Sequence, residues 1–180
     1  MAKTWWSITV ELVEARDERF WPRPGRIFAA APTFVFADLA DAIDTAFARW
    51  DRSHLHEFRF ADDRRIGMMD PDEDDDVVDE ARTKLSLLSP GDRFLYVFDF
   101  GDGWHHLCTV GASKVDPLDE LGIKPSMPLA YDGWGDIPDQ YGRRWAADDG
   151  SGSPVPPDPR CADLPPFFPW WGEGANRYPD

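Results

Sequence analysis

Apolar and polar residues alternate along the first part of the chain, with the period of two that is typical of a β-strand with one buried face. The alternation covers residues 5–13, where Trp5, Ile8, Val10 and Leu12 are mixed with Ser7, Thr9 and Glu11. Residues 19–25 contain two prolines and a glycine, which predicts a turn or an edge segment. A second short strand is expected at residues 27–30.

Between residues 36 and 50 the apolar positions follow helical spacing instead. The apolar face consists of Phe36, Leu39, Ile43, Ala46, Phe47 and Trp50. Asp38 and Asp41 lie early in this segment, where carboxylates favour the positive end of a helix. Residues 54–60 return to alternation, which predicts a strand with His54, His56, Phe58 and Phe60 on one side.

Residues 70–80 contain eight acidic side chains and no basic one, which predicts a solvated loop. A short helix is expected to follow and to end at residues 89–92. Its inward side would be formed by Val77, Val78, Ala81, Leu85 and Leu88.

Residues 94–110 have the pattern of a β-hairpin, because two runs of β-forming residues flank the turn Gly101-Asp102-Gly103. Proline and glycine dominate from residue 125 on, and residues 148–154 have the composition of a flexible spacer. The stretch 164–171 (Leu-Pro-Pro-Phe-Phe-Pro-Trp-Trp) is apolar and aromatic, so we expect it to pack on the domain or on a partner.

These patterns predict an α+β fold. We expect a mostly antiparallel sheet, with one long and one short helix packed on it and a Pro-rich C-terminal wrap. The domain would span residues 1–147, and residues 148–180 would form a C-terminal extension rich in Pro, Gly and aromatic residues.

Composition narrows the classes of function. With 180 residues, of which 42% are hydrophobic, the chain can bury a sizeable core. A net charge of −15 disfavours general binding to nucleic acid, since an acidic surface repels phosphates. No apolar stretch approaches the roughly 18 residues of a membrane span, and the two cysteines form no CxxC pair. We therefore expect a cytoplasmic protein that does not bind membranes.

The predicted hairpin turn carries the candidate chemistry. Asp99, Asp102, His105 and His106 crowd this turn, and such groups are costly to bury unless they are paired or reactive. The imidazoles of His54 and His56, two residues apart on one strand face, could chelate one ion together with His106. The candidate metal ligands are therefore His54, His56, Asp99, Asp102 and His106.

Each candidate also has a structural interpretation. His106 could be a core histidine with one bonded nitrogen, Asp102 could stabilise the turn, and Asp99 could be a buried carboxylate that accepts bonds from backbone amides. Trp50 and Trp104 are expected in the core or in a pocket wall.

Two sequence motifs are similar to those of a known protein family. Trp50-x3-His54-Leu-His-x-Phe58 is followed by Tyr96-Val-Phe-Asp-Phe-Gly-Asp-x-Trp-x-His106, and together they resemble the plasmid pRiA4b ORF-3-like family. Members of this family are described as insertion-element passenger proteins. The resemblance covers residues 4–145 and implies a compact α+β domain with an antiparallel sheet, but no established biochemical role. Residues 132–142 occupy the place of a Pro-Pro-Glu-Asp-x-Gly-Gly element and depart from it.

Three hypotheses follow. The first is a small binding or interaction module, linked to mobile elements, whose pocket is lined by Trp50, His54, His56, Asp99, Asp102, Trp104 and His106. The second is a metal-dependent hydrolase or nuclease that uses the same His and Asp residues; its catalytic residues are unknown, and a divalent metal would be the cofactor. The third is a polar core network without a ligand. The partner would be a protein or a small molecule, and the aromatic C-terminal stretch could mediate homo-oligomers.

Overall fold

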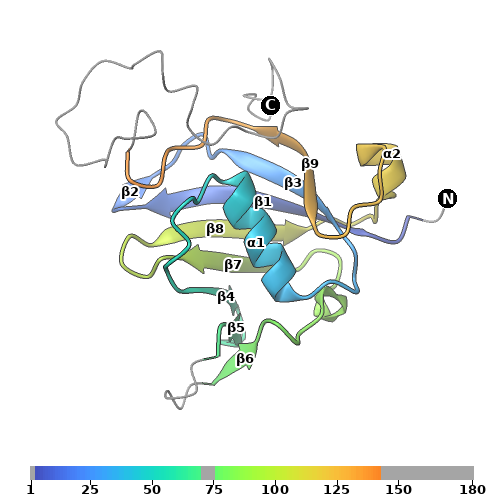
Figure 1. The fold of residues 1–180 in the computed structure, drawn as a ribbon, viewed down its shortest axis with the longest axis horizontal. Helices are drawn as coiled ribbons and strands as arrows, with labels where there is room; N and C mark the ends of the chain where they lie inside the picture. The colour runs from blue at the N-terminus through green and yellow to red at the C-terminus, as the bar shows by residue number, and fades with distance from the viewer. Residues whose placement is uncertain (1–2, 70–75, 143–180) are drawn as a thin grey trace.

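A computed structural model describes residues 3–69 and 76–142. Within these ranges the chain forms a nine-stranded sheet and two α-helices (Figure 1). The strands are β1 (Trp6–Ala15), β2 (Glu18–Arg19), β3 (Gly25–Ala30), β4 (His56–Phe60), β5 (Arg65–Gly67), β6 (Val77–Asp79), β7 (Arg93–Phe98), β8 (Trp104–Val110) and β9 (Leu129–Trp134). The helices are α1 (Phe36–Ala46) and α2 (Pro117–Leu121), with a 3-10 turn at Leu85–Leu87.

The strand order is β6-β5-β4-β7-β8-β1-β3-β9, and β2 pairs with the end of β1. All of these pairs are antiparallel except β5 with β6. The predicted α+β fold with a mostly antiparallel sheet is therefore confirmed. None of the described helices has the length and apolarity needed to cross a bilayer.

Helix α1 covers one face of the sheet, as Figure 1 shows. Its Phe36, Leu39 and Ile43 are fully buried against the strand residues Ile8 and Val10. The helix begins where the carboxylate of its third residue, Asp38, accepts a hydrogen bond of 2.9 Å from the backbone N–H of Val35. Burial of these large side chains supplies the main favourable free energy of folding, roughly 1.5–3 kcal/mol for each.

The predicted helix over residues 36–50 ends earlier, at Ala46. Ala48 has a φ of 54°, which interrupts the helical backbone, and the N–H of Arg49 then bonds the carbonyl of Asp44 at 2.8 Å. After this interruption the side chain of Arg49 enters the core, where the residue is 1% exposed. As a result, Trp50 is not on the buried helix face but lies 39% exposed in the following loop.

The short helix predicted after the acidic run does not form. Val77–Asp79 is strand β6, which pairs in parallel with β5, and Val78 is exposed. The two valines are compatible with extended backbone, and pairing with β5 makes this segment a strand. Leu85 and Leu88 are buried as expected.

The second helix is instead α2, which residue spacing did not reveal. The carboxylate of Asp116 caps it by accepting a bond of 2.9 Å from the N–H of Leu118, and Gly122 ends it in the left-handed conformation, at a φ of 70°.

Part of the predicted organisation falls outside the described residues. This holds for acidic residues 70–75 and for the C-terminal predictions, which comprise the spacer 148–154, the aromatic stretch 164–171 and the extension 148–180. Glu80, which was expected in the solvated loop, is buried and contacts His56.

The described elements cover the second face of the sheet only in part. Leu121 of α2 packs there against Trp5 and Ala29, which alternate with the residues that face α1. Along β8, Trp104, His106 and Cys108 alternate with His105 and other half-exposed residues. The buried set points toward α1 and the half-exposed set points away from it, because successive side chains of a strand alternate. The two adjacent histidines of the hairpin therefore lie on opposite faces.

Candidate functional site

His106 lies in the core and is fully buried. Its Nδ1 is 3.2 Å from the carbonyl oxygen of Tyr96, and its ring packs edge-on against Phe47 at 4.9 Å between centroids. Burial disfavours the imidazolium, and the nearby positive charge of Arg49 disfavours it further, so the pKa of His106 falls to about 3. The side chain is therefore neutral at physiological pH, as the structural interpretation of a core histidine requires.

Arg49 stacks on Trp104, with its guanidinium carbon 3.6 Å from the ring centroid. Its Nε donates to the carbonyl of Phe47 at 2.8 Å, and its Nη2 donates to that of Pro138 at 3.0 Å. Burial lowers the pKa of Arg49 to about 9. Arg49 Nη1, Trp104 Nε1 and His106 Nε2 are buried and have no hydrogen-bond partner among the described residues. The motif residues Trp104 and His106 thus form a polar centre inside the core, beneath α1.

Asp99 stabilises the hairpin turn. Its Oδ1 accepts hydrogen bonds from the backbone N–H groups of Gly101 at 2.9 Å and Asp102 at 3.3 Å. Asp99 itself has a φ of 58°, which Asp tolerates better than most residues. Its other oxygen is 3.3 Å from Nδ1 of His54, so these two predicted site residues do come together.

The late segment that follows β9 binds the loop that contains Trp50 and His54. Gln140 is fully buried and forms two bonds with the backbone of Asp51, one of 3.0 Å and one of 3.1 Å. Trp50 Nε1 donates to Asp139 at 3.0 Å, and the hydroxyl of Tyr141 lies 2.6 Å from Nε2 of His54. These contacts connect the first of the two sequence motifs to the late segment, and they engage Trp50 and His54, two of the predicted pocket residues.

His56 lies in a different environment, where its Nε2 is 3.0 Å from both carboxylate oxygens of Glu80. Burial alone would lower the pKa of His56, but Glu80 raises it more, and the net shift is upward. Beside this pair the hydroxyl of Tyr96 donates to the buried carboxylate of Asp44 at 2.9 Å, and burial raises the pKa of Asp44 to about 6.

The predicted metal ligands therefore separate into distinct environments. His54 pairs with Asp99, His56 with Glu80, His106 is enclosed in the core, and Asp102 lies 3.9 Å from the Nε of Arg16. In residues 3–69 and 76–142 no group of three or more His, Cys, Asp or Glu side chains is arranged to hold a metal ion. The metal interpretation of these five residues is not supported, because strand alternation and local pairing direct the side chains apart.

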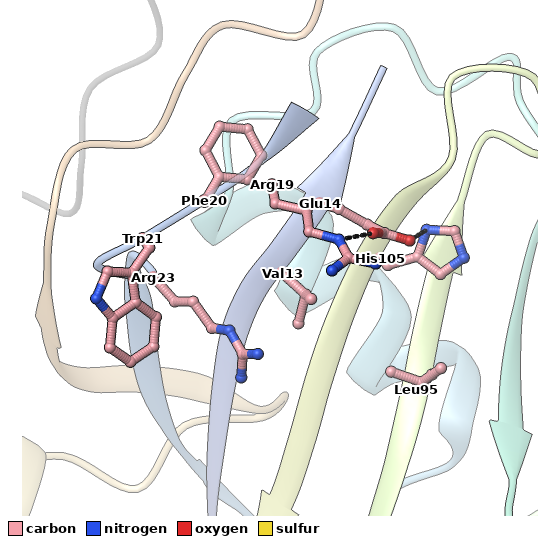
Figure 2. A pocket seen from close by; sticks show the side chains of 8 residues that line it. All are labelled: Val13, Glu14, Arg19, Phe20, Trp21, Arg23, Leu95 and His105. Carbon is pink, nitrogen blue, oxygen red and sulfur yellow. Dashed lines mark ion pairs between the residues drawn. The ribbon is translucent and has the colours of Figure 1, made fainter. Parts of the chain in front are cut away.

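Two adjoining hollows lie on the open side of the sheet, around the end of β1. The first has a volume of about 420 Å³ and is lined by Val13, Glu14, Arg19, Phe20, Trp21, Arg23, Leu95 and His105 (Figure 2). The second, of about 330 Å³, is lined by Glu14, Ala15, Asp17, Arg19, Gly101, Asp102, Gly103 and His105. Glu14, Arg19 and His105 belong to both, and together the two hollows form what we term the open-face groove.

Glu14 connects the polar groups of this groove. Its carboxylate oxygens lie 3.5 Å from Nε of Arg19 and 3.7 Å from Nδ1 of His105 (Figure 2). The register of β1 on β8 shifts between Leu12 and Glu14, so that Val13 and Glu14 both line the groove. A β-bulge of this kind redirects side chains next to many binding sites.

The rim of the groove carries an exposed aromatic side chain. Trp21 is 85% exposed, and the guanidinium carbon of Arg23 lies 6.0 Å from the Trp21 ring centroid. The floor is apolar and includes Val13 and Leu95. Trp21 and Arg23 lie in the segment that joins β2 to β3, next to the strand end where the bulge occurs.

Of the predicted site residues, Asp102 alone lines the groove among the described residues. Sequence reasoning missed Glu14, Arg19, Trp21 and Arg23, and it selected His106 rather than its neighbour His105. The alternation within β8 was a usable signal for His105, since it assigns the two histidines to opposite faces. The bulge that brings Glu14 into the groove has no comparable signal in the sequence.

Comparison with known proteins gives three findings. The sequence model of the plasmid pRiA4b ORF-3-like protein family matches residues 7–140. An uncharacterized protein of Sinorhizobium fredii, y4hQ, is 44% identical over 64 residues, which is 32% of this chain and only 30% of that protein's length. The crystal structure of MM3350, a protein of unknown function from Methanosarcina mazei Go1, is similar with a TM-score of 0.59 and 23% identity; the similarity covers 76% of this chain and 72% of that one. The last similarity concerns the fold alone.

Proposed function

This chain belongs to the plasmid pRiA4b ORF-3-like protein family, and from that premise we propose that it is a binding module whose open-face groove holds an extended peptide segment. The link to mobile elements and the cytoplasmic location remain predictions from the sequence. The single observation that carries the proposal is the 85% exposed Trp21 at the rim of a groove with an apolar floor.

The chemistry of the groove supports a peptide with apolar and aromatic or proline side chains. A large exposed aromatic ring next to arginine is the type of residue that dominates the free energy of binding in interfaces. Phe20, Val13 and Leu95 offer apolar contacts below it, while Arg19, Arg23 and Glu14 supply hydrogen-bonding groups for a peptide backbone. Proline-rich segments bind grooves of this kind because their backbone is already extended.

The shape also favours an extended ligand. The two hollows adjoin each other through their shared residues Glu14, Arg19 and His105, and together they form an elongated surface depression. Sites for small molecules instead enclose most of the ligand surface. The metal-dependent hydrolase is the less favoured alternative, because the His and Asp residues on which it was based lie in separate environments and no metal-binding group is found in the described part of the chain.

The test uses the full-length chain with serine at Phe167, Phe168, Trp170 and Trp171, so that its own aromatic stretch cannot compete for the groove. Binding of a fluorescein-labelled proline- and aromatic-rich decapeptide is measured by fluorescence anisotropy. The Trp21→Ala substitution should weaken binding at least about tenfold, as expected for a tryptophan hot spot. Ile123→Ala, which alters an exposed apolar side chain outside the groove, is the matched control and should leave the affinity unchanged. Absence of binding, or equal affinity of the Trp21→Ala and control chains, would overturn the proposal.

A further inference from the structure

The described fold ends beside the open-face groove. A Cβ atom placed on Gly142, the last described residue, would lie 3.9 Å from Nη1 of Arg16. The backbone N–H of Arg16 donates to the carbonyl of Asp102 at 2.7 Å, and Asp102 lines the second hollow of the groove. In Figure 1 the described part of the chain after β9 likewise stops near β2. The last described residue therefore lies near one end of the groove.

The chemistry of those residues matches the groove. Residues 164–171 contain three prolines, two phenylalanines and two tryptophans, with a leucine at the start. Proline restricts φ to values near those of the polyproline II helix, so such a segment loses little conformational entropy when it binds. Aromatic side chains on both partners, including Phe20 and Trp21 of the groove, can then bury each other.

We infer that residues 164–171 are the occupant of the open-face groove, and that they bind it within the same chain. This inference rests on the function proposed above, since it names the peptide that the groove holds. It gives the groove an intramolecular partner, and any external peptide must displace that partner in order to bind.

The length of the connection favours binding within one chain. Residues 143–163 separate Gly142 from the aromatic stretch. A chain of this length with random-coil statistics would have a root-mean-square span of roughly 25 Å, which exceeds the reach needed for a site next to its starting point. Tethering at this distance corresponds to an effective concentration on the order of 1 mM. A contact with a Kd of about 0.1 mM would therefore be about 90% formed within the chain.

The two native cysteines provide the experiment. Cys161 lies three residues before the aromatic stretch, whereas Cys108 is fully buried and its thiol has a pKa raised by that burial, so it does not react. Arg19→Cys introduces a thiol at the groove rim, and Arg82→Cys introduces one beyond β6, near the opposite edge of the sheet. The two arginine side chains are equally exposed, at 88%, which makes Arg82 a matched control.

The full-length variants are oxidised mildly at low protein concentration, and the disulfide between Cys161 and the introduced thiol is followed by peptide mass spectrometry. We expect the Arg19→Cys chain to close an intrachain disulfide at least about tenfold faster than the Arg82→Cys chain. Adding Trp21→Ala to Arg19→Cys should reduce the rate to that of the control. Equal rates in the two single variants, or no effect of Trp21→Ala, would overturn the inference. A disulfide between two chains would instead identify a second copy as the source of the occupant and would also overturn it.

Comparison with the peptide assay separates this inference from the proposed function. If the chain with serines at the four aromatic positions binds the decapeptide through Trp21 but the disulfide rates are equal, the groove binds peptides and the intramolecular occupant is wrong. If the decapeptide does not bind at all, the proposed function fails as well. Intramolecular occupancy further requires the unsubstituted chain to bind the decapeptide about tenfold more weakly than the serine variant.

Discussion

The burial of the His106 imidazole leads to a quantitative prediction of how the free energy of unfolding depends on pH. The side chain is fully buried, and its pKa falls from the ordinary 6.5 to about 3 because burial and Arg49 both disfavour the charged form. In the unfolded chain His106 takes up a proton below about pH 6.5, while in the folded chain it stays neutral down to about pH 3. The unfolded state therefore binds more protons in this window, and the folded state loses stability as the pH falls.

The size of the effect follows from the difference in pKa. Each pH unit below the unfolded pKa contributes about 1.4 kcal/mol, so His106 alone should lower the free energy of unfolding by about 2 kcal/mol between pH 6.5 and about pH 4.5. Substitution by a side chain that cannot titrate removes this slope. His106→Asn is suitable, because its amide nitrogen can replace Nδ1 as a donor to the carbonyl of Tyr96.

The assay is urea unfolding followed by tryptophan fluorescence at several pH values. The His106→Asn chain will be less stable than the wild type at pH 7, because the smaller side chain leaves a cavity. The difference in free energy of unfolding between the two chains should shrink by about 2 kcal/mol as the pH falls to about 4.5. The reason is that only the wild type has a buried imidazole that is protonated on unfolding. Cys108→Ala, two residues along the same buried face of β8, is the control and should remain parallel to the wild type across this range.

Parallel curves for the wild type and His106→Asn would refute the reasoning. They would mean that His106 takes up its proton equally in the folded and unfolded states, which requires water or a carboxylate beside the ring. A deficit that grows toward acid pH would contradict it as well, because that sign requires a raised pKa in the folded state.

Two further outcomes follow from the packing. Asp44 has a pKa raised to about 6 by burial, so the wild type should lose about 2 kcal/mol of stability relative to Asp44→Asn as the pH rises from about 4 to about 6. This slope is opposite in sign to that of His106 and can be measured in the same unfolding series. Gly25→Ala should destabilise the fold by about 1–3 kcal/mol, seen as a lower Tm, because the added Cβ would overlap the ring of Trp134; an unchanged Tm would show that the ring can move away freely.

The periodicity of the sequence was sufficient to predict the elements that depend on local pattern. The alternation of Ile8, Val10 and Leu12 predicts β1, and the runs on either side of Gly101-Asp102-Gly103 predict the hairpin of β7 and β8. Local signals failed where a long-range contact decided the outcome. The helix ends at Ala46, and three residues later the guanidinium of Arg49 stacks on the ring of Trp104 in β8. The segment Val77–Asp79 becomes a strand because it pairs with β5.

The contacts of the candidate site were even harder to predict from local sequence patterns than the helices and strands. The sequence identified the residues around the turn as unusual, and the structure brings His54 and Asp99 together as a pair. It did not indicate that Tyr141 and Gln140, some ninety residues further along, would bind the loop that carries His54. Partners of that kind are set by how the late segment folds back, which no local pattern encodes.

By itself, then, the sequence determined the family, the antiparallel α+β architecture and the faces of the regular strands, because a strand exposes its residues with a fixed period that burial makes visible. Only the tertiary structure decided which titratable groups meet and where the surface is hollow. The open-face groove arises from the register shift in β1, the short strand β2 and the neighbouring β7 and β8, which are brought together by pairing between distant segments. His105 and His106 are adjacent in the chain, yet one faces this groove and the other is buried beneath α1, because side chains alternate and α1 covers one face of the sheet.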